Sequence, residues 1–172
     1  MRKVNPNILP ERRLQIIGEI TDKSYKKFSK KLYELEISDP RETITIELSS
    51  EGGDAMAALA YSTRIRRCKT PIIIIAYGLV ASAAVLILAS GERRLMAKEA
   101  WVMVHEDSGV LEGNTSSLER QVKHMRRLEN QWNKLLAEYT TTEAEEWDFL
   151  ALNETYLCAG ECRDLGLVDK II

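Results

Sequence analysis

A run of β-branched residues, Ile72–Ile75, constrains the fold of this chain more than any other feature. Four consecutive isoleucines are typical of a strand buried on both faces, as strands are in parallel sheets that helices cover. Gly78 follows the run, and a small apolar segment begins at Ala83. The sequence therefore predicts a strand, a glycine turn and a helix, with Ser82 at the junction of turn and helix.

Two roles are open to Ser82 at such a junction. The N-terminus of a helix carries unpaired N–H groups and the positive end of the helix dipole, so it favours a developing negative charge. A serine there is a plausible nucleophile. Serine is also strongly preferred as a simple helix cap, so the surrounding residues have to decide between the two roles.

Strands and helices alternate along the whole chain. This alternation predicts one α/β domain with a largely parallel sheet and right-handed crossovers. A glycine-rich loop is expected at residues 109–113, before the longest helix. The expected strands cover residues 13–18, 43–48, 72–76, 95–97, 101–105 and 167–172, and the expected helices cover 22–39, 55–63, 83–90, 115–139, 143–150 and 160–164.

The longest periodic element covers residues 115–139. Its apolar residues recur at spacings of three and four, which indicates an amphipathic helix. Such a helix is about 36 Å long at 1.5 Å per residue, roughly the diameter of a whole domain. It either lies along the sheet or projects from it, and a projecting helix has to bury its apolar stripe against another subunit.

Composition excludes several classes of function. The chain has 172 residues, of which 45% are hydrophobic and 29% charged, and its net charge is -2, so nothing favours nucleic-acid binding. Residues 1–10 lack the apolar core of a signal peptide, and no apolar run is long enough to span a bilayer. Three cysteines in no regular framework suggest reduced thiols, and Cys158 and Cys162 lack further metal ligands nearby. We expect a cytoplasmic protein without a metal or cofactor.

Three expected strands end in chemically distinctive residues: Gly52-Gly53, Ser82 and His105. Function in an open α/β sheet gathers beyond the carboxyl ends of the strands. Acyl transfer needs a nucleophile, a base, an orienting carboxylate and donors for the oxyanion. The diglycine lets backbone N–H groups approach a substrate carbonyl, and the Ala83 N–H would be the second donor. A histidine at a strand end is often only structural, but the one other histidine, His124, lies off the apolar stripe of its helix.

Four segments in order resemble the proteolytic subunit of the Clp protease, ClpP. The likeness runs from about residue 12 to residue 172. It implies a ClpP/crotonase-like spiral of βαβ units in a single domain over residues 1–172, with a protruding handle helix at about 115–139. The segments are Ser50-Glu51-Gly52-Gly53, Gly78-Leu79-Val80-Ala81-Ser82, Trp101-Val102-Met103-Val104-His105, and Tyr156-Leu157-Cys158-Ala159 running into Gly166-Leu167-Val168-Asp169.

The resemblance also implies roles for single residues. Ser82 takes the place of the nucleophile, His105 that of the general base, and Gly53 and Ala83 those of the oxyanion donors. Counting back from Gly166 without a gap, the family's catalytic aspartate falls on Glu154, whose extra methylene the site has to accommodate. The rival acids are Asp148 and Asp107.

The resemblance further implies a serine endopeptidase that hydrolyses peptides or unfolded polypeptides inside an oligomeric chamber. The implied assembly is a homo-oligomer of heptameric rings stacked as a tetradecamer, and the implied partner is an AAA+ Clp ATPase. The short segment before Arg12 leaves little chain for the axial loop that contacts such an ATPase. Two alternatives stay open: a catalytically inactive ring subunit, for which Glu154 is the reason, and a crotonase-type acyl-CoA enzyme.

Overall fold

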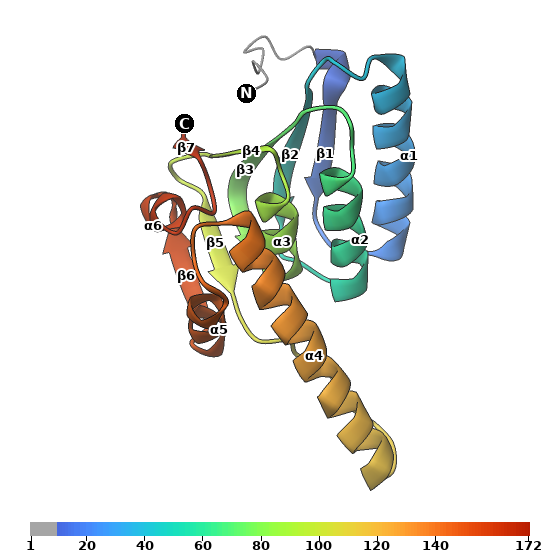
Figure 1. Ribbon diagram of the computed structural model, residues 1–172, viewed down its shortest axis with the longest axis vertical. Helices are drawn as coiled ribbons and strands as arrows, with labels where there is room; N and C mark the ends of the chain where they lie inside the picture. The colour runs from blue at the N-terminus through green and yellow to red at the C-terminus, as the bar shows by residue number, and fades with distance from the viewer. Residues whose placement is uncertain (1–9) are drawn as a thin grey trace.

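A seven-stranded sheet runs through the centre of the molecule (Figure 1), and the computed structural model describes residues 10–172. Its strands are β1 (Arg13–Ile17), β2 (Ile44–Ser50), β3 (Ile72–Ala81), β4 (Arg93–Met96), β5 (Trp101–Val104), β6 (Thr155–Cys158) and β7 (Lys170–Ile171). The strand order is β1-β2-β3-β4-β7, and β5 branches from β3 and carries β6. All pairs are parallel except β5 with β6, so the predicted α/β class is confirmed.

Helices connect the strands. After a short 3₁₀ turn, η1 (Pro10–Arg12), they are α1 (Asp22–Ser38), α2 (Ala55–Arg66), α3 (Ala83–Ala89), α4 (Thr115–Tyr139), α5 (Ala144–Leu152) and α6 (Ala159–Asp164). Polar caps explain where the first two α-helices begin: Thr21 and Ser24 form a capping box, and Asp54 accepts the Ala57 N–H at 2.6 Å. In Figure 1, α1, α2, α3 and the C-terminal half of α4 follow one another in a row, each packed on the next.

The strand β3 is longer than the sequence predicts. A glycine turn was expected after Ala76, but the strand continues through Gly78, which adopts φ 57°, and ends at Ala81. The extension pairs with a different neighbour: β4 lies beside Ile73–Ala76, whereas β5 lies beside Leu79–Ala81. The left-handed conformation of Gly78 and a register shift in β2 accommodate the change of neighbour from β4 to β5. The glycine therefore bends β3 and does not end it.

The helix α3 lies at the centre of the core. Each of its seven residues is buried, because the helix packs against β3 on one side and against α2 and α4 on the others. A helix that is apolar all round is stable only in such a position. Its N-terminus is thereby fixed relative to the carboxyl end of β3, where Ser82 stands.

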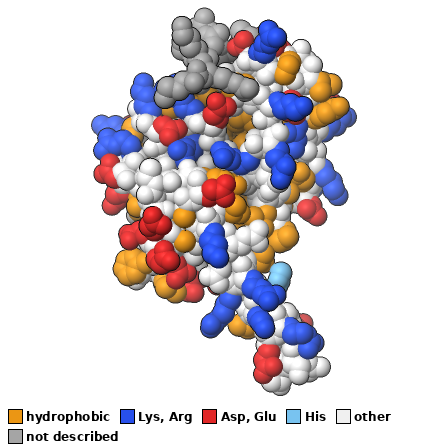
Figure 2. Space-filling model, in the orientation of Figure 1, with side chains coloured by type: hydrophobic (Ala, Val, Ile, Leu, Met, Phe, Trp, Pro, Cys, Tyr) orange, Lys and Arg blue, Asp and Glu red, His pale blue; other side chains and the backbone are white. Residues whose placement is uncertain are grey.

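The helix α4 covers the residues for which the long helix was expected, and Figure 1 shows its N-terminal half projecting beyond the rest of the molecule. Its only buried residues are Asn133 and Leu136, both in the C-terminal half. Figure 2 shows Lys and Arg side chains on the projecting half and a group of acidic side chains over α5. The exposed side chains include His124, in agreement with the sequence analysis.

None of the helices in residues 10–172 combines the length and the apolar character needed to cross a bilayer. The absence of a signal peptide and the short axial segment are predictions for residues that lie almost entirely outside the described part of the chain.

One ion pair links α1 to α2. Glu36 accepts hydrogen bonds from Arg64 Nη2 and from the Lys69 backbone N–H, both at 2.7 Å, and its side chain is only 16% exposed. Burial raises the pKa of Glu36, but the Lys69 N–H and the Arg64 guanidinium together outweigh burial, so the net pKa lies below its ordinary value. The folded state therefore favours the carboxylate form.

We expect Glu36→Gln to lower the free energy of unfolding by about 1 kcal/mol at pH 7. Because the folded pKa is depressed, the contribution of the carboxylate is complete above the unfolded value of 4.5 and is lost as the pH falls through the folded value. Urea unfolding of both proteins at pH 7 and pH 3.5 measures this. Glu34→Gln, an exposed neighbour on α1, is the control, and an equal Glu36→Gln effect at both pH values contradicts the assignment.

Candidate active site

The register of β3 and β5 brings Ser82 and His105 together. Ala81 lies opposite Met103 in the parallel ladder, and the Ser82 N–H donates to the Met103 carbonyl oxygen at 2.8 Å. His105 follows the end of β5 directly. The Ser82 Oγ and His105 Nε2 atoms are 2.8 Å apart, which is hydrogen-bond distance for a nucleophile and its base.

The backbone of Ser82 directs its hydroxyl toward the histidine. Ser82 has φ 53° and ψ −125°, a left-handed conformation that costs about 1 kcal/mol or more for a residue other than glycine. It is the N-cap residue of α3, but its side chain makes no capping hydrogen bond. The hydroxyl is paired with His105 instead, so the helix-cap role does not account for this serine.

Gly53 and Ala83 line the crevice beside Ser82. Gly53 forms an isolated parallel bridge with Ile20, in which the Ile20 N–H bonds Gly52 and the Asp54 N–H bonds Ile20. In such a bridge the N–H of Gly53 itself points away from Ile20, and Gly53 lines the crevice beside Ser82. Ala83 begins α3, so its N–H has no partner within the helix. Within residues 10–172 neither N–H donates a hydrogen bond, and both are therefore available to an oxyanion.

Gly52 lies against the nucleophile. A Cβ atom on Gly52 would stand 2.7 Å from the Ser82 Cβ, 2.8 Å from the Ala81 carbonyl oxygen and 3.1 Å from the Ala83 nitrogen, and the residue has φ +100°. Only glycine allows so close an approach in this conformation. Gly52 and Gly53, which follow β2, thus allow the backbone to lie against Ser82 at the end of β3.

Glu154 follows α5 in a turn and precedes β6. The antiparallel ladder pairs Val104 with Thr155, so one further step of the same register sets His105 opposite Glu154. The ladder ends before that step, because Glu154 adopts φ 46°, and its side chain is exposed. Among the described residues no carboxylate hydrogen-bonds the second ring nitrogen of His105. The structure thus brings Ser82 and His105 into contact but not His105 and Glu154.

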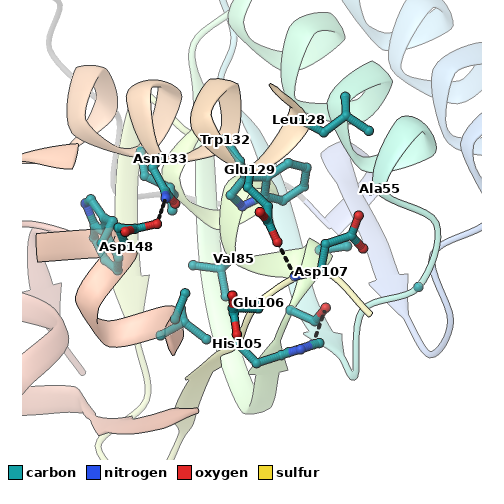
Figure 3. Close-up of a pocket in the computed structure, with 17 residues that line it drawn as sticks. Ala55, Val85, His105, Glu106, Asp107, Leu128, Glu129, Trp132, Asn133 and Asp148 are labelled. Carbon is teal, nitrogen blue, oxygen red and sulfur yellow. Dashed lines mark hydrogen bonds between the residues drawn. The ribbon is translucent and has the colours of Figure 1, made fainter. Parts of the chain in front are cut away.

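A crevice of about 100 Å³ opens beside Ser82 and His105 (Figure 3). Both rival acids line it: Asp107 follows β5, and Asp148 on α5 accepts a hydrogen bond from Asn133 Nδ2 at 3.0 Å. Glu154 is not among the lining residues. The apolar part of the wall is formed by side chains from α3, α4, α5 and β5, namely Val85, Val104, Leu128, Trp132, Leu136, Trp147 and Ala151.

Three residues of α4 that no sequence pattern indicated also line the crevice: Glu129, Trp132 and Asn133. Trp132 belongs to the apolar stripe of α4, but nothing in the stripe indicates which of its turns faces the strand ends. Figure 3 shows Glu129 and Trp132 extending from α4 toward the segment that carries His105 and Asp107. The carboxylate of Glu129 accepts the Asp107 backbone N–H at 3.3 Å.

The electrostatic environment of the crevice is acidic. Burial is the largest cause that raises the pKa of Glu129; the Asp107 N–H lowers it, and repulsion by Glu106, Asp107 and Asp148 raises it further. Within residues 10–172 no group of three or more His, Cys, Asp or Glu residues is placed to hold a metal ion. The crevice therefore offers negative charge without a metal-binding geometry.

A branched parallel sheet with a projecting helix defines a ClpP/crotonase-like α/β fold. The family model of the Clp protease matches residues 1–172. A curated relative, the ATP-dependent Clp protease proteolytic subunit 2 of Treponema denticola, is 33% identical over 165 residues, which is 95% of this chain and 82% of the relative. A solved structure of a ClpP1 mutant from Listeria monocytogenes superposes with a TM-score of 0.86 at 28% identity, over 94% of this chain and 91% of that one.

This chain belongs to the Clp protease family. The resemblance inferred from the four sequence segments is therefore confirmed, together with the fold that it implies. Members of the family are proteases that form oligomeric rings and work with Clp ATPases.

We expect Gly52→Ala to lower the rate at which Ser82 is phosphonylated about 100-fold or more, because the new Cβ displaces Ser82 and the Ala83 N–H, and a shift of about 1 Å is enough for such a loss. The rate is measured with a fluorophosphonate probe. Gly18→Ala is a matched control, since Gly18 also has a positive φ, +79°, but has no atom within 4 Å of the new Cβ. Equal losses in the two variants indicate backbone strain alone and contradict the steric argument.

Proposed function

We propose that this chain is a serine endopeptidase that hydrolyses peptides or unfolded polypeptides, with Ser82 as nucleophile and His105 as general base. The observation that carries the proposal is the 2.8 Å hydrogen bond between Ser82 Oγ and His105 Nε2 at the carboxyl ends of adjacent strands. A second support is the pair of free N–H groups of Gly53 and Ala83 beside the nucleophile. Together these groups supply what acyl transfer requires.

The mechanism proceeds in two halves. Ser82 Oγ attacks the peptide carbonyl carbon while His105 Nε2 takes the hydroxyl proton, and the N–H groups of Gly53 and Ala83 donate to the oxyanion. His105 then gives the proton to the leaving amine, the C–N bond breaks and an acyl-Ser82 ester remains. Water attacks this ester with His105 again acting as base, which releases the carboxylic acid and restores the hydroxyl.

We assign the third role, the orientation of His105, to Glu154. The support is the register of β5 and β6, since one more step of that ladder sets the two residues opposite each other, and directly opposed residues have Cβ atoms about 5 Å apart. The carboxylate makes no hydrogen bond to His105 in this conformation. The role therefore requires the turn at Glu154 to rearrange so that the carboxylate reaches the imidazole.

A fluorophosphonate probe tests the nucleophile. We expect the wild-type protein to be labelled on Ser82, Ser82→Ala to take up no label, and His105→Ala to react about 10² to 10⁴-fold more slowly because the general base is lost. Mass spectrometry of tryptic peptides identifies the labelled residue. Absence of label in assembled wild-type protein, or label on another serine, overturns the proposal.

The same probe separates the candidate acids. We expect Glu154→Ala to slow labelling about 100-fold or more, and Glu154→Asp to retain most of the rate, because loss of the orienting acid leaves the imidazole misaligned. Glu146→Gln, an exposed carboxylate on α5 outside the crevice, is the control. A large loss in Asp148→Asn combined with a normal rate in Glu154→Ala transfers the role to Asp148.

We further propose that the chain acts as a homo-oligomer of heptameric rings stacked as a tetradecamer, and that it encloses its substrates. The support is the projecting half of α4, whose apolar residues lack cover in the isolated chain; Val122 is 41% exposed. An AAA+ Clp ATPase is the partner that family membership suggests. Native mass spectrometry of the purified protein measures the number of subunits.

The second candidate function is that of an inactive ring subunit that assembles with an active relative. The observation that favours it is the absence of a hydrogen bond between Glu154 and His105. Under this alternative the protein incorporates into mixed rings but takes up no fluorophosphonate. The acyl-CoA alternative has no comparable support, because it leaves the Ser82–His105 hydrogen bond without a use.

A further inference from the structure

The crevice beside the nucleophile has an apolar base and an acidic rim. Apolar side chains such as Val85, Leu128 and Trp132 line it, and Ser82 and His105 form one of its walls. The carboxylates reach it from separate elements: Glu129 from α4, Asp148 from α5, and Glu106 and Asp107 from the segment after β5 (Figure 3). Among the described residues that line the crevice there is no lysine or arginine.

The charge of these four carboxylates is not compensated inside the chain. Within residues 10–172 none of them takes part in an ion pair; all four salt bridges of this region lie elsewhere. Glu129 accepts a hydrogen bond from the Asp107 N–H and Asp148 accepts one from the Asn133 amide, so a neighbouring group orients each of these carboxylates at the cavity. Burial raises the pKa of Glu129 and repulsion by Glu106, Asp107 and Asp148 raises it further, so a cation placed among these carboxylates is attracted by all of them.

The shape of the crevice suits a long side chain. Its carboxylates are too dispersed to converge on a metal ion. A lysine or arginine has an apolar stem that packs on Leu128 and Trp132, and a cationic head that reaches the carboxylates at the rim. An uncharged aliphatic side chain would fill the same space but would shield the carboxylates from water without pairing them, which is unfavourable.

We propose that this crevice binds the side chain of the substrate residue whose carbonyl group Ser82 attacks, and that it selects lysine or arginine at that position. The inference rests on the proposed peptidase function, because Ser82 Oγ fixes the position of the carbonyl carbon and thereby places the adjoining side chain at the mouth of the crevice. Glu129 and Asp148 are the specificity-determining residues. Cleavage occurs after basic residues.

Two peptide amides that differ in one group test the proposal: acetyl-Leu-Leu-Lys-aminomethylcoumarin and its norleucine counterpart, whose side chain keeps the four-carbon stem of lysine and lacks the ammonium group. We expect kcat/KM of the wild-type protein to be roughly 10-fold or more higher for the lysine peptide, since a charge-assisted hydrogen bond contributes at least that much. Equal rates, or faster cleavage of the norleucine peptide, overturn the proposal.

Charge-neutral variants assign the preference to named residues. We expect Glu129→Gln to reduce the lysine-to-norleucine ratio several-fold, and Glu129→Gln combined with Asp148→Asn to bring it to about 1. Glutamine retains an oxygen for the Asp107 N–H, so the wall of the crevice keeps its shape. Glu138→Gln removes one charge from an exposed position on the same helix outside the crevice, and we expect it to leave the ratio unchanged. A lysine preference that survives in the double variant overturns the assignment.

A binding measurement separates this inference from the proposed chemistry. Ser82→Ala protein is titrated by calorimetry with acetyl-Leu-Leu-Lys-amide and with the norleucine amide, neither of which needs to be cleaved. Roughly 10-fold tighter binding of the lysine peptide supports the crevice assignment even if wild-type Ser82 takes up no fluorophosphonate, in which case only the peptidase proposal fails. Equal binding, or no binding of either peptide, overturns the crevice assignment whatever the labelling result.

Discussion

The alignment of β3 with β5 is the interaction on which the candidate site depends. The hydrogen bond from the Ser82 N–H to the Met103 carbonyl oxygen closes the last pair of this parallel ladder, in which Ala81 lies opposite Met103. It thereby sets Ser82, the candidate nucleophile, one register step before His105 along the neighbouring strand. A one-residue slip of a strand moves each of its side chains to the other face of the sheet, so this register alone decides whether the two residues meet.

A second constraint comes from backbone atoms rather than side chains. The proposed oxyanion donors are the N–H groups of Gly53 and Ala83, which the bridge to Ile20 and the first turn of α3 hold in place. A backbone N–H group is the same in every residue except proline. The identity of the residue at these positions therefore matters only through the size of its side chain. Gly52 illustrates this, because its missing Cβ lets Ser82 and Ala83 approach closely.

Much of this arrangement could be predicted from the sequence, because strand-end residues are determined by local patterns. The strong β-propensity of Ile72–Ile75, the cap residue Asp54 and the diglycine each fix one element, and parallel strands bring their carboxyl ends to one edge of the sheet. The continuation of β3 through Gly78 could not be predicted in this way. A glycine between apolar residues indicates a turn or a bend equally well, and the exchange of β4 for β5 as partner depends on strands distant in the sequence.

The crevice illustrates a different limit of sequence-based prediction. Its wall includes Glu129 and Trp132, and these reach the site because α4 packs against α3 and α5. A periodic stripe specifies which residues of a helix share a face but not which neighbour each of its turns meets. The prediction of the acid opposite His105 is limited in the same way. The spacing from Gly166 identifies Glu154 but cannot show that the backbone of Glu154 leaves the ladder with φ 46°.

The two halves of α4 therefore connect the candidate site to the surface that projects from the fold. Leu128, Glu129 and Trp132 line the crevice, whereas Val122 and the residues before it extend beyond the rest of the molecule on the same continuous helix. An α-helix is stiff over this length, so a subunit that packs against the projecting half constrains the position of the crevice wall as well. In the proposed assembly, α4 would therefore link the contacts between subunits to the wall of the crevice, whereas the register of β3 and β5 sets the distance between Ser82 and His105.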